Sequence, residues 1–346
     1  MESCGCPYTA SAKAFAMRVY EEFPFGNISP NERKLFWSLV ATSWLVTFVR
    51  QNGQRNYSIV DRLWPLLPAG LVVQWTWDSG VFSTDANTAA AAAVRGKALM
   101  AVALVLVWSV RLCYNSVRRG DYAWGAEDYR WLYVRKHMGS CWAVWEMFNL
   151  LFVSLFQISV VYLMAVPVRS LIWHSSTAAG GVSNKADDGY SGAEAMLLAA
   201  MVALLVGEAV ADQQQYDLQM LKRKAAPETI DSTARRAEVE AGFVHTGLWR
   251  YSRHPNVFCE AAFWVTMGVF CARATGTELA SVDAAWLLAG PLLLALLVQA
   301  SVRLTEQISS AKYPLYRAYQ MRTSRLLPMP PLSNEQVIGR AHRHQA

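Results

Sequence analysis

VWEMFNLLFVSLFQISVVYLMAV, residues 144–166, decides the fold class of this chain. The run contains one charged residue, Glu146, and exceeds the roughly 20 residues needed to cross a hydrocarbon core of about 30 Å. The whole chain is 53% hydrophobic and 17% charged, whereas soluble domains carry about 25% charged residues. A soluble all-α enzyme does not need apolar runs of this length. We therefore predict an all-α, polytopic membrane protein.

About seven membrane spans are predicted from the apolar runs. They cover residues 35–49, 59–77, 98–114, 144–166, 193–211, 257–272 and 284–302. Together they form a single transmembrane domain over residues 34–330, between an N-terminal segment, 1–33, and a C-terminal tail, 331–346. Lys and Arg gather in the linkers after the third, fifth and seventh spans. The positive-inside rule puts those linkers and the C-terminus in the cytosol.

The N-terminal segment then lies on the non-cytosolic side. Asn27-Ile28-Ser29 is a glycosylation sequon there, weakened by Pro30. Cys4 and Cys6 form a C-x-C pair with no second pair or histidine set nearby, so we expect no metal site.

Polar residues recur at helical spacing within four predicted spans, near the ends assigned to the cytosol. They are Asp61, Arg111, Asn115, Glu208, Asp212, Arg303 and Glu306. Ionisable groups inside a membrane are expensive and favour a functional interpretation. We expect these side chains to line one shared polar cavity. A purely structural charge network, or side chains that reach toward the headgroups, would produce the same pattern.

The block GLWRYSRHPNVFCE, Gly247–Glu260, has the composition of an anion site. Pro255 suits the first position of a helix, which makes His254 the N-cap. The free N–H groups and positive dipole of that helix start attract anions, and Arg250 and Arg253 precede it. The block suits a cofactor with phosphates or a carboxylate and a heteroaromatic base. The alternative interpretation is structural: a capped helix start whose aromatic residues and arginines lie at the membrane interface.

Arg253-His254-Pro255-Asn256 followed by Glu260 resembles the R-H-P-N-Y-x-G-E signature of the steroid 5α-reductase superfamily. Further elements resemble, in order, those of its branch of uncharacterised membrane proteins, over residues 57–330. They are D-R-x-W at 61–64, R-L-x-Y-N at 111–115, R-R-G at 118–120, E-D-Y-R at 127–130, A-D-x-Q at 211–214 and Y-P-x-Y…Y-Q…T-S…P at 313–328. Val257 and Cys259 depart from the usual Tyr and Gly.

The resemblance implies an enzyme that binds NADPH at the cytosolic ends of the later helices. The matching cofactor positions, together with Arg250, are Asp212, Arg253, His254, Asn256, Glu260, Tyr316 and Tyr319. It implies an oxidoreductase of the CH–CH group that passes hydride to a conjugated enone in a sterol or other lipid reached from the bilayer. A hydrogen-bond donor must stabilise the developing enolate. Tyr114 and Tyr57 are the candidates.

Two other functions remain open at this point. A related group of membrane methyltransferases, acting on prenylcysteine or phospholipids, also uses an R-H-P helix start and binds S-adenosylmethionine, and Glu306 matches its later glutamate. A non-catalytic membrane subunit that kept the fold is the third possibility, favoured by Val257 and Cys259. The resemblance implies the endoplasmic reticulum, with a mitochondrial or other membrane also compatible, and we expect no nucleic-acid partner.

Overall fold

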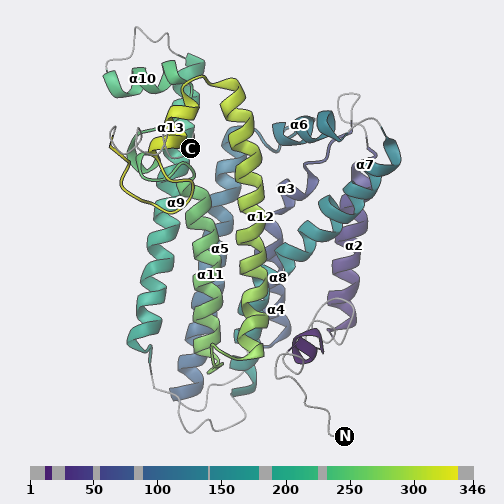
Figure 1. The fold of residues 1–346 in the computed structure, drawn as a ribbon. Coiled ribbons are helices and arrows are strands. Elements are labelled where there is room, and N and C mark those ends of the chain that lie inside the picture. The colour runs from purple at the N-terminus through teal and green to yellow at the C-terminus, as the bar shows by residue number, and fades with distance from the viewer. Residues whose placement is uncertain are drawn as a thin grey trace, which may run out of the picture. The chain divides into compact units, whose positions relative to one another are not determined.

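The computed structural model describes residues 12–17, 28–49, 55–81, 89–138, 141–178, 189–224 and 232–333. Asn27, Cys4, Cys6 and the tail from residue 334 lie outside these ranges, so the expectations that concern them stay predictions. Within the described ranges there are helices and no strand, which confirms the all-α prediction. Figure 1 shows the course of the chain from α2 to α13.

Five helical segments in the described ranges are long and apolar enough to span a membrane. They are Ala91–Arg119, Trp142–Ser176, Gly192–Arg223, Pro255–Ala274 and Val282–Lys312. These segments correspond to the third through seventh predicted spans, and the chain is a polytopic membrane protein. The predicted orientation, with a cytosolic C-terminus, stays a prediction.

The first two predicted spans form shorter helices. The first corresponds to α2, Pro30–Val46, whose start is fixed by a capping box between Ser29 and Glu32. The second is not continuous. It divides into α3, Ile59–Leu63, and α4, Leu66–Asp78, because Pro65 lacks an N–H and interrupts the helical hydrogen bonds.

The chain divides into two compact units, which are described separately. The first unit contains Met1–Met201 and Trp264–Leu294, and the second contains Val202–Phe263 and Ala295–Ala346. The division falls within three helices: α9, Gly192–Lys224; α11, Pro255–Ala274; and α12, Val282–Lys312.

In the first unit, α8, Gln157–Ala178, packs against α4 and against α5, Ala89–Arg119. Trp108 of α5 meets Trp264 of α11 edge to face, with ring centroids 5.1 Å apart. Gly290 of α12 lies against the backbone of Leu163: a Cβ at this position would come within 2.1 Å of the Leu163 carbonyl carbon. The absence of a side chain therefore lets α12 approach α8 closely.

One stretch of the longest apolar segment is not α-helical. After α7, Trp142–Phe148, the chain forms a π-helix, η1, over Asn149–Phe156, and then continues as α8. The apolar run over residues 144–166 is therefore helical throughout, as predicted. Its part from Asn149 to Phe156 has the wider turn of a π-helix. Single-turn π-segments occur preferentially at functional sites.

A short polar helix completes the first unit. Helix α6, Tyr129–His137, starts at Asp128, whose carboxylate accepts the Arg130 N–H. Its Trp131 donates to Asp61 of α3 at 2.9 Å. The second unit has corresponding short helices, α10 at Thr233–Ala241, η3 at Gly247–Arg250 and α13 at Tyr316–Arg322.

A buried ion pair joins two of the spans in the first unit. Lys97 of α5 reaches both carboxylate oxygens of Glu194 of α9 at 2.9 Å, and the two side chains are 10% and 5% exposed. Ser191 also donates to this carboxylate. A buried charge that loses its partner is strongly destabilising.

We expect Lys97→Met to lower the free energy of unfolding by about 3–5 kcal/mol, because it leaves the Glu194 charge buried without a cation. Arg119, paired with Asp121 at the surface with both side chains over 40% exposed, is the matched control. Arg119→Met should cost at most about 1 kcal/mol. The measurement is denaturant unfolding in detergent micelles. An equal loss of unfolding free energy in the two variants would contradict the buried position of the Lys97–Glu194 pair.

Candidate functional site

The Arg-His-Pro block forms the start of α11 as predicted. Pro255 occupies the first helical position, and the His254 carbonyl accepts the Phe258 N–H at 3.0 Å. His254 is therefore the N-cap. The preceding η3 turn begins at Gly247, whose φ of +58° is in the left-handed region. All of these residues belong to the second unit.

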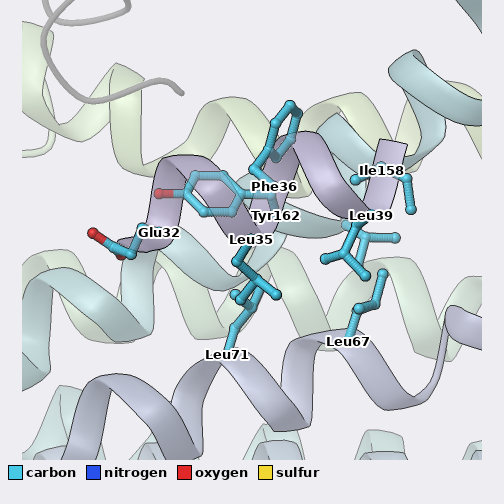
Figure 2. A pocket seen from close by; sticks show the side chains of 9 residues that line it. Glu32, Leu35, Phe36, Leu39, Leu67, Leu71, Ile158 and Tyr162 are labelled. Carbon is cyan, nitrogen blue, oxygen red and sulfur yellow. The ribbon is translucent and has the colours of Figure 1, made fainter. Parts of the chain in front are cut away.

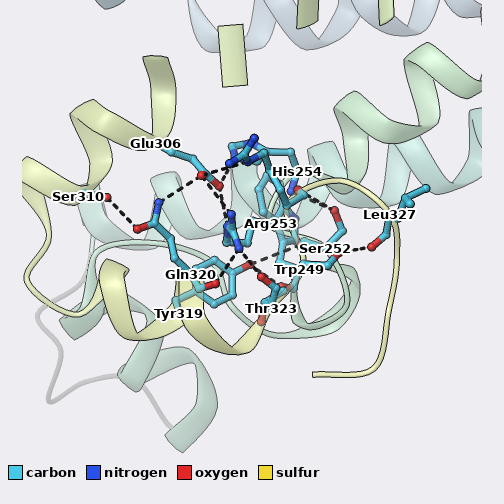
Figure 3. Close-up of polar contacts among 12 residues, drawn as sticks. Trp249, Ser252, Arg253, His254, Glu306, Ser310, Tyr319, Gln320, Thr323 and Leu327 are labelled. Carbon is cyan, nitrogen blue, oxygen red and sulfur yellow. Dashed lines mark hydrogen bonds and ion pairs between the residues drawn. The ribbon is translucent and has the colours of Figure 1, made fainter. Parts of the chain in front are cut away.

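Arg253 points inward, where its guanidinium is engaged on all three nitrogens (Figure 3). Its Nε and Nη2 donate to the two carboxylate oxygens of Glu306 on α12, at 2.6 and 3.1 Å. Its Nη1 donates to the carbonyls of Gln320, at 2.9 Å, and of Thr323. One buried side chain thus connects the start of α11 to α12 and to α13. Arginine suits this position because its planar fork matches a carboxylate on two edges.

Glu306 is the common acceptor of this cluster. His254 lies with Nε2 3.2 Å from Glu306 Oε1, and Gln320 donates Nε2 to Oε2 at 3.2 Å. Arg325 Nε is 3.6 Å from Oε2. Arg253, His254 and Glu306 are all buried. We name these five residues, Arg253, His254, Glu306, Gln320 and Arg325, the Glu306 cluster.

The A-D-x-Q element of α9 packs directly on the block. Trp249 donates its indole N–H to the Ala211 carbonyl at 3.2 Å. The Leu248 N–H reaches Gln214 Oε1 at 3.1 Å, and Asn256 Nδ2 reaches Asp212 Oδ1 at 3.1 Å. Residues separated in sequence by more than 30 positions therefore meet as one polar surface.

The Y-Q…T-S element, Tyr319 to Ser324, packs on the Arg-His-Pro block as well. The Tyr319 hydroxyl donates to the Trp249 carbonyl, and its ring lies 5.2 Å from that of Phe243. The ring of Tyr316, also buried, packs edge to face on Phe243. The Arg253 N–H bonds to the Ser324 carbonyl at 2.9 Å. Tyr316 and Tyr319 thus contribute to the packing that holds the block.

Polar groups remain available at the rim of this assembly. Asn256 Oδ1 is a buried acceptor with no hydrogen-bond partner within the described residues. Its amide orientation is fixed, because the NH₂ end faces the Asp212 carboxylate. Arg250 is exposed one turn before the start of α11, and Glu260 is half-buried within its second turn. The rim therefore offers acceptors for a donor-bearing ligand and a cation beside a helix N-terminus.

Cys259 lies where the resembled signature has a glycine, and a glycine on α9 makes room for its side chain. Cys259 is buried, and Gly207 of α9 faces it: a Cβ at 207 would lie 3.2 Å from the Cys259 sulfur. The absence of a side chain at Gly207 therefore leaves room for the Cys259 sulfur against α9. Val257 is half-buried at the first turn.

The polar residues of the first unit mostly hold its loops. Arg62 donates to the carbonyls of Asp121 and Ala126, at 3.1 and 2.7 Å. The Tyr57 N–H bonds to Glu127 at 2.9 Å, so the segment before α3 is held against the loop before α6. Asn115 accepts from Arg118 at 2.9 Å, and Arg111 lies on the same helix, α5.

The two proton-donor candidates lie in contrasting surroundings. Tyr57 is 3% exposed, packed edge to face on Trp145. Tyr114 is 65% exposed, with the Arg118 guanidinium over its ring.

The predicted polar cavity draws on both units. Asp61, Arg111 and Asn115 belong to the first unit, whereas Glu208, Arg303 and Glu306 belong to the second. Glu208 and Glu306 are buried, and Arg303 is exposed. A cavity shared by all four helices stays a prediction.

Comparison with known proteins gives the family. Residues 47–323 match the protein family of unknown function DUF1295, which is part of the steroid 5α-reductase-like superfamily. The chain belongs to this family. An uncharacterized protein of Schizosaccharomyces pombe is 34% identical over 282 residues, covering 79% of this chain and 73% of the yeast protein. No solved structure matches the chain.

Sequence reasoning missed one buried carboxylate that shapes the site. Glu238 of α10 is fully buried and accepts the N–H groups of His245 and Thr246, at 3.1 and 3.0 Å, and the Thr246 hydroxyl at 2.7 Å. These bonds fix the turn that leads into Gly247. Burial by itself raises the pKa of this carboxyl, but the hydrogen bonds from Thr246 and His245 and the nearby Arg235 outweigh it and lower the pKa.

A carboxyl with a lowered folded-state pKa stabilises the protein above its unfolded pKa, here the ordinary 4.5, and loses that contribution as the pH falls through the folded value. Glu238→Gln should therefore lower Tm at pH 7, and the gap to wild type should shrink as the pH is taken below the ordinary value. Thermal unfolding across this pH range tests it. A gap that stays constant with pH would show that the charge contributes nothing.

Gly247→Ala should destabilise more than Gly120→Ala. Both glycines have positive φ, +58° and +88°, which costs a non-glycine residue about 1–2 kcal/mol. At Gly120 a Cβ meets open space, whereas at Gly247 it would lie 2.3 Å from the Gln214 amide. Moving Gln214 breaks its bond to Leu248, an additional loss of about 1 kcal/mol. Equal shifts of Tm for the two variants would contradict this packing.

Proposed function

We propose that this protein is a membrane-embedded, NADPH-dependent reductase of a hydrophobic conjugated enone, a sterol or another lipid. The observation that carries the proposal is the rim around the start of α11. There the Asn256 amide oxygen has no donor among the residues that the structure describes, the Asn256 NH₂ donates to Asp212 at 3.1 Å, and Arg250 is exposed next to the helix N-terminus. Family membership in a reductase-like superfamily supports it.

The chemistry of these groups fits a dinucleotide. Ribose hydroxyls and a carboxamide NH₂ are donors, and the Asn256 and Asp212 oxygens are acceptors. Pyrophosphate and a 2′-phosphate are anions, and the α11 N-terminus with Arg250 is cationic. Arg250, the cation at the rim, favours NADPH over NADH for the same reason. NADPH, when bound, would supply a hydride for the β-carbon of the enone.

Within this proposal the predicted cofactor residues divide into two groups. Asp212, Asn256, Arg250 and Glu260 line the rim and would bind the cofactor. Arg253, His254, Tyr316 and Tyr319 hold the block in position through the contacts to Glu306, Phe243 and Trp249. Substitution of a residue in the second group would then weaken cofactor binding, because the Arg-His-Pro block would no longer be held in position.

Tyr57 is the better of the two candidates for the donor that stabilises the enolate oxygen. A hydrogen-bond donor has its greatest effect in a site that excludes water. Tyr57 is almost completely buried, whereas Tyr114 is exposed over most of its surface.

The methyltransferase alternative depends on Glu306. Both oxygens of this carboxylate are already taken by Arg253 and Gln320, with His254 beside them. This saturation argues for a structural role of Glu306 and favours the reductase. The non-catalytic alternative rested on Val257 and Cys259, and Gly207 compensates for the second.

NADPH should raise the Tm of the purified protein in detergent by a few degrees at saturation, because it binds the folded state only. Asn256→Ala should lose this shift while its own Tm stays near wild type. Ser310→Ala, which removes a hydroxyl bonded only to Gln320, should keep the shift. S-adenosylhomocysteine should have no effect; a shift with it alone would support the methyltransferase, and indifference to both ligands would overturn the proposal.

A further inference from the structure

The segment after α13 in the second unit exposes a run of apolar side chains. Residues 324–332, which we name the C-terminal strap, contain the sequence Leu-Leu-Pro-Met-Pro-Pro. Within it Leu327 and Met329 are 64% and 54% exposed, and Pro328 and Pro330 are exposed as well. A run of four exposed apolar residues is avoided on a surface that faces water unless it has a function.

Main-chain hydrogen bonds fix the strap on both sides. The Met329 N–H donates to the Tyr251 carbonyl, just before α11, and the Leu332 N–H donates to the Arg322 carbonyl of α13. Both bonds are 2.9 Å long. The backbone of the strap is therefore paired within the chain, and this pairing holds the exposed side chains on the outside.

Apolar side chains elsewhere in the chain are covered by their neighbours. In the first unit, Leu39 of α2 and Leu67 and Leu71 of α4 lie around one small pocket between their helices (Figure 2), and none of the three is exposed. Leu327 and Met329 are not covered in this way by the residues that the structure describes. An apolar layer outside those residues would bury them.

The strap lies at about the depth of the phospholipid headgroups. The apolar run of α12 ends at Val302, and Glu306 follows four residues later, about 6 Å further along the helix axis. The headgroup layer on each side of a bilayer is about 5–8 Å thick. Arg253 bonds to the Glu306 carboxylate and to the carbonyl of Thr323, the residue before the strap. The strap therefore begins in the layer where α11 and α12 leave the hydrocarbon.

The charges around the strap are of one sign. Residues 307–333 contain four cations, Lys312, Arg317, Arg322 and Arg325, and no acidic residue. Arg322 is exposed, and the Arg325 side chain is 41% exposed although its Nε lies 3.6 Å from Glu306. Guanidinium groups bind phosphate, and apolar side chains beside them reach the acyl chains below a headgroup. The strap combines both features.

Charge also separates an anionic lipid from two other occupants. A second copy that met the strap with its own strap would bring arginines against arginines, which repel each other. Residues 334–346 contain Arg340 and Arg343 but one acidic residue, Glu335, so this tail is not attracted to the strap. The positive-inside rule predicts that this end of the spans faces the cytosolic leaflet, and that leaflet carries anionic lipids.

We propose that the C-terminal strap binds the headgroups of anionic phospholipids. Arg322 and Arg325 contact the phosphate, and Leu327 and Met329 enter the outer part of the acyl-chain layer. Because the Met329 N–H is bonded to the Tyr251 carbonyl, the bound lipid also stabilises the segment that leads into the Arg-His-Pro block. The inference does not depend on the proposed reductase function.

The test uses the full-length protein without NADPH, in nanodiscs of phosphatidylcholine alone or of equal parts phosphatidylcholine and phosphatidylglycerol. Phosphatidylglycerol should raise the Tm of wild type by about 2 °C or more, because it binds the folded state. Arg322→Gln should lose about half of this gain, and Arg322→Gln/Arg325→Gln most of it. Arg273→Gln removes an exposed arginine at the opposite end of α11. It is the matched control and should keep the gain.

Amide hydrogen exchange locates the contact. In wild type, the amides of residues 324–332 should exchange more slowly in the discs with phosphatidylglycerol, and in the double arginine variant they should not. Leu327→Gln/Met329→Gln should also reduce the gain in Tm, because polar side chains do not enter the acyl layer. A variant that ends at Ser333 should keep the gain, since the proposed contacts precede the tail.

Several results would overturn the proposal. They include an equal Tm in the two bilayers, a gain of wild-type size in the double arginine variant, and an equal loss of the gain in Arg273→Gln. A gain lost with the tail would assign the lipid contact to Arg340 and Arg343 instead. Discs that hold two copies of wild type but one copy of the Leu327→Gln/Met329→Gln variant would identify a second copy as the occupant.

Discussion

The second unit depends on the buried ion pair between Arg253 and Glu306. Its two charge-assisted hydrogen bonds, at 2.6 and 3.1 Å, join the start of α11 to α12, and Nη1 adds the carbonyls at the end of α13. A buried guanidinium is tolerated only when its donors are satisfied, and here an acidic residue and two main-chain oxygens do so. Lysine, with one compact ammonium group, could not reach all these acceptors from one position.

This pair brings together residues that lie far apart in the sequence. The guanidinium requires Glu306, Glu306 receives His254 and Gln320, and the Ser324 carbonyl receives the Arg253 N–H. Removal of Arg253 or Glu306 would leave its buried partner without its counter-charge. The R-H-P-N element and the later Y-Q-T-S element are therefore one structural unit, and Asn256 and Asp212 lie at its edge, bonded to each other.

The sequence was sufficient for features that depend on local patterns. Apolar length predicted the third through seventh spans, and Pro255 after a polar residue predicted the helix start at His254. The sequence did not show where the Arg253 side chain points, because its direction depends on Glu306, 53 residues away. The same holds for Lys97 with Glu194 and for Glu238 with Thr246, because composition does not show which charges meet. The π-helix of Asn149–Phe156 had no sequence signal, since its apolar residues fit an α-helix equally well.

The degree of hydrogen-bond satisfaction separates the roles of the two polar regions. In the Glu306 cluster the donors of Arg253 meet acceptors within the chain, and such a network gives a unique, rigid arrangement. In η1 the oxygens of Asn149 and Ser154 meet no donor within the described ranges, although both residues are buried. A buried polar group without a partner is not explained by folding, because an apolar residue of similar size would be cheaper. The saturated cluster therefore fits a structural role, which holds the start of α11 against α12 and α13.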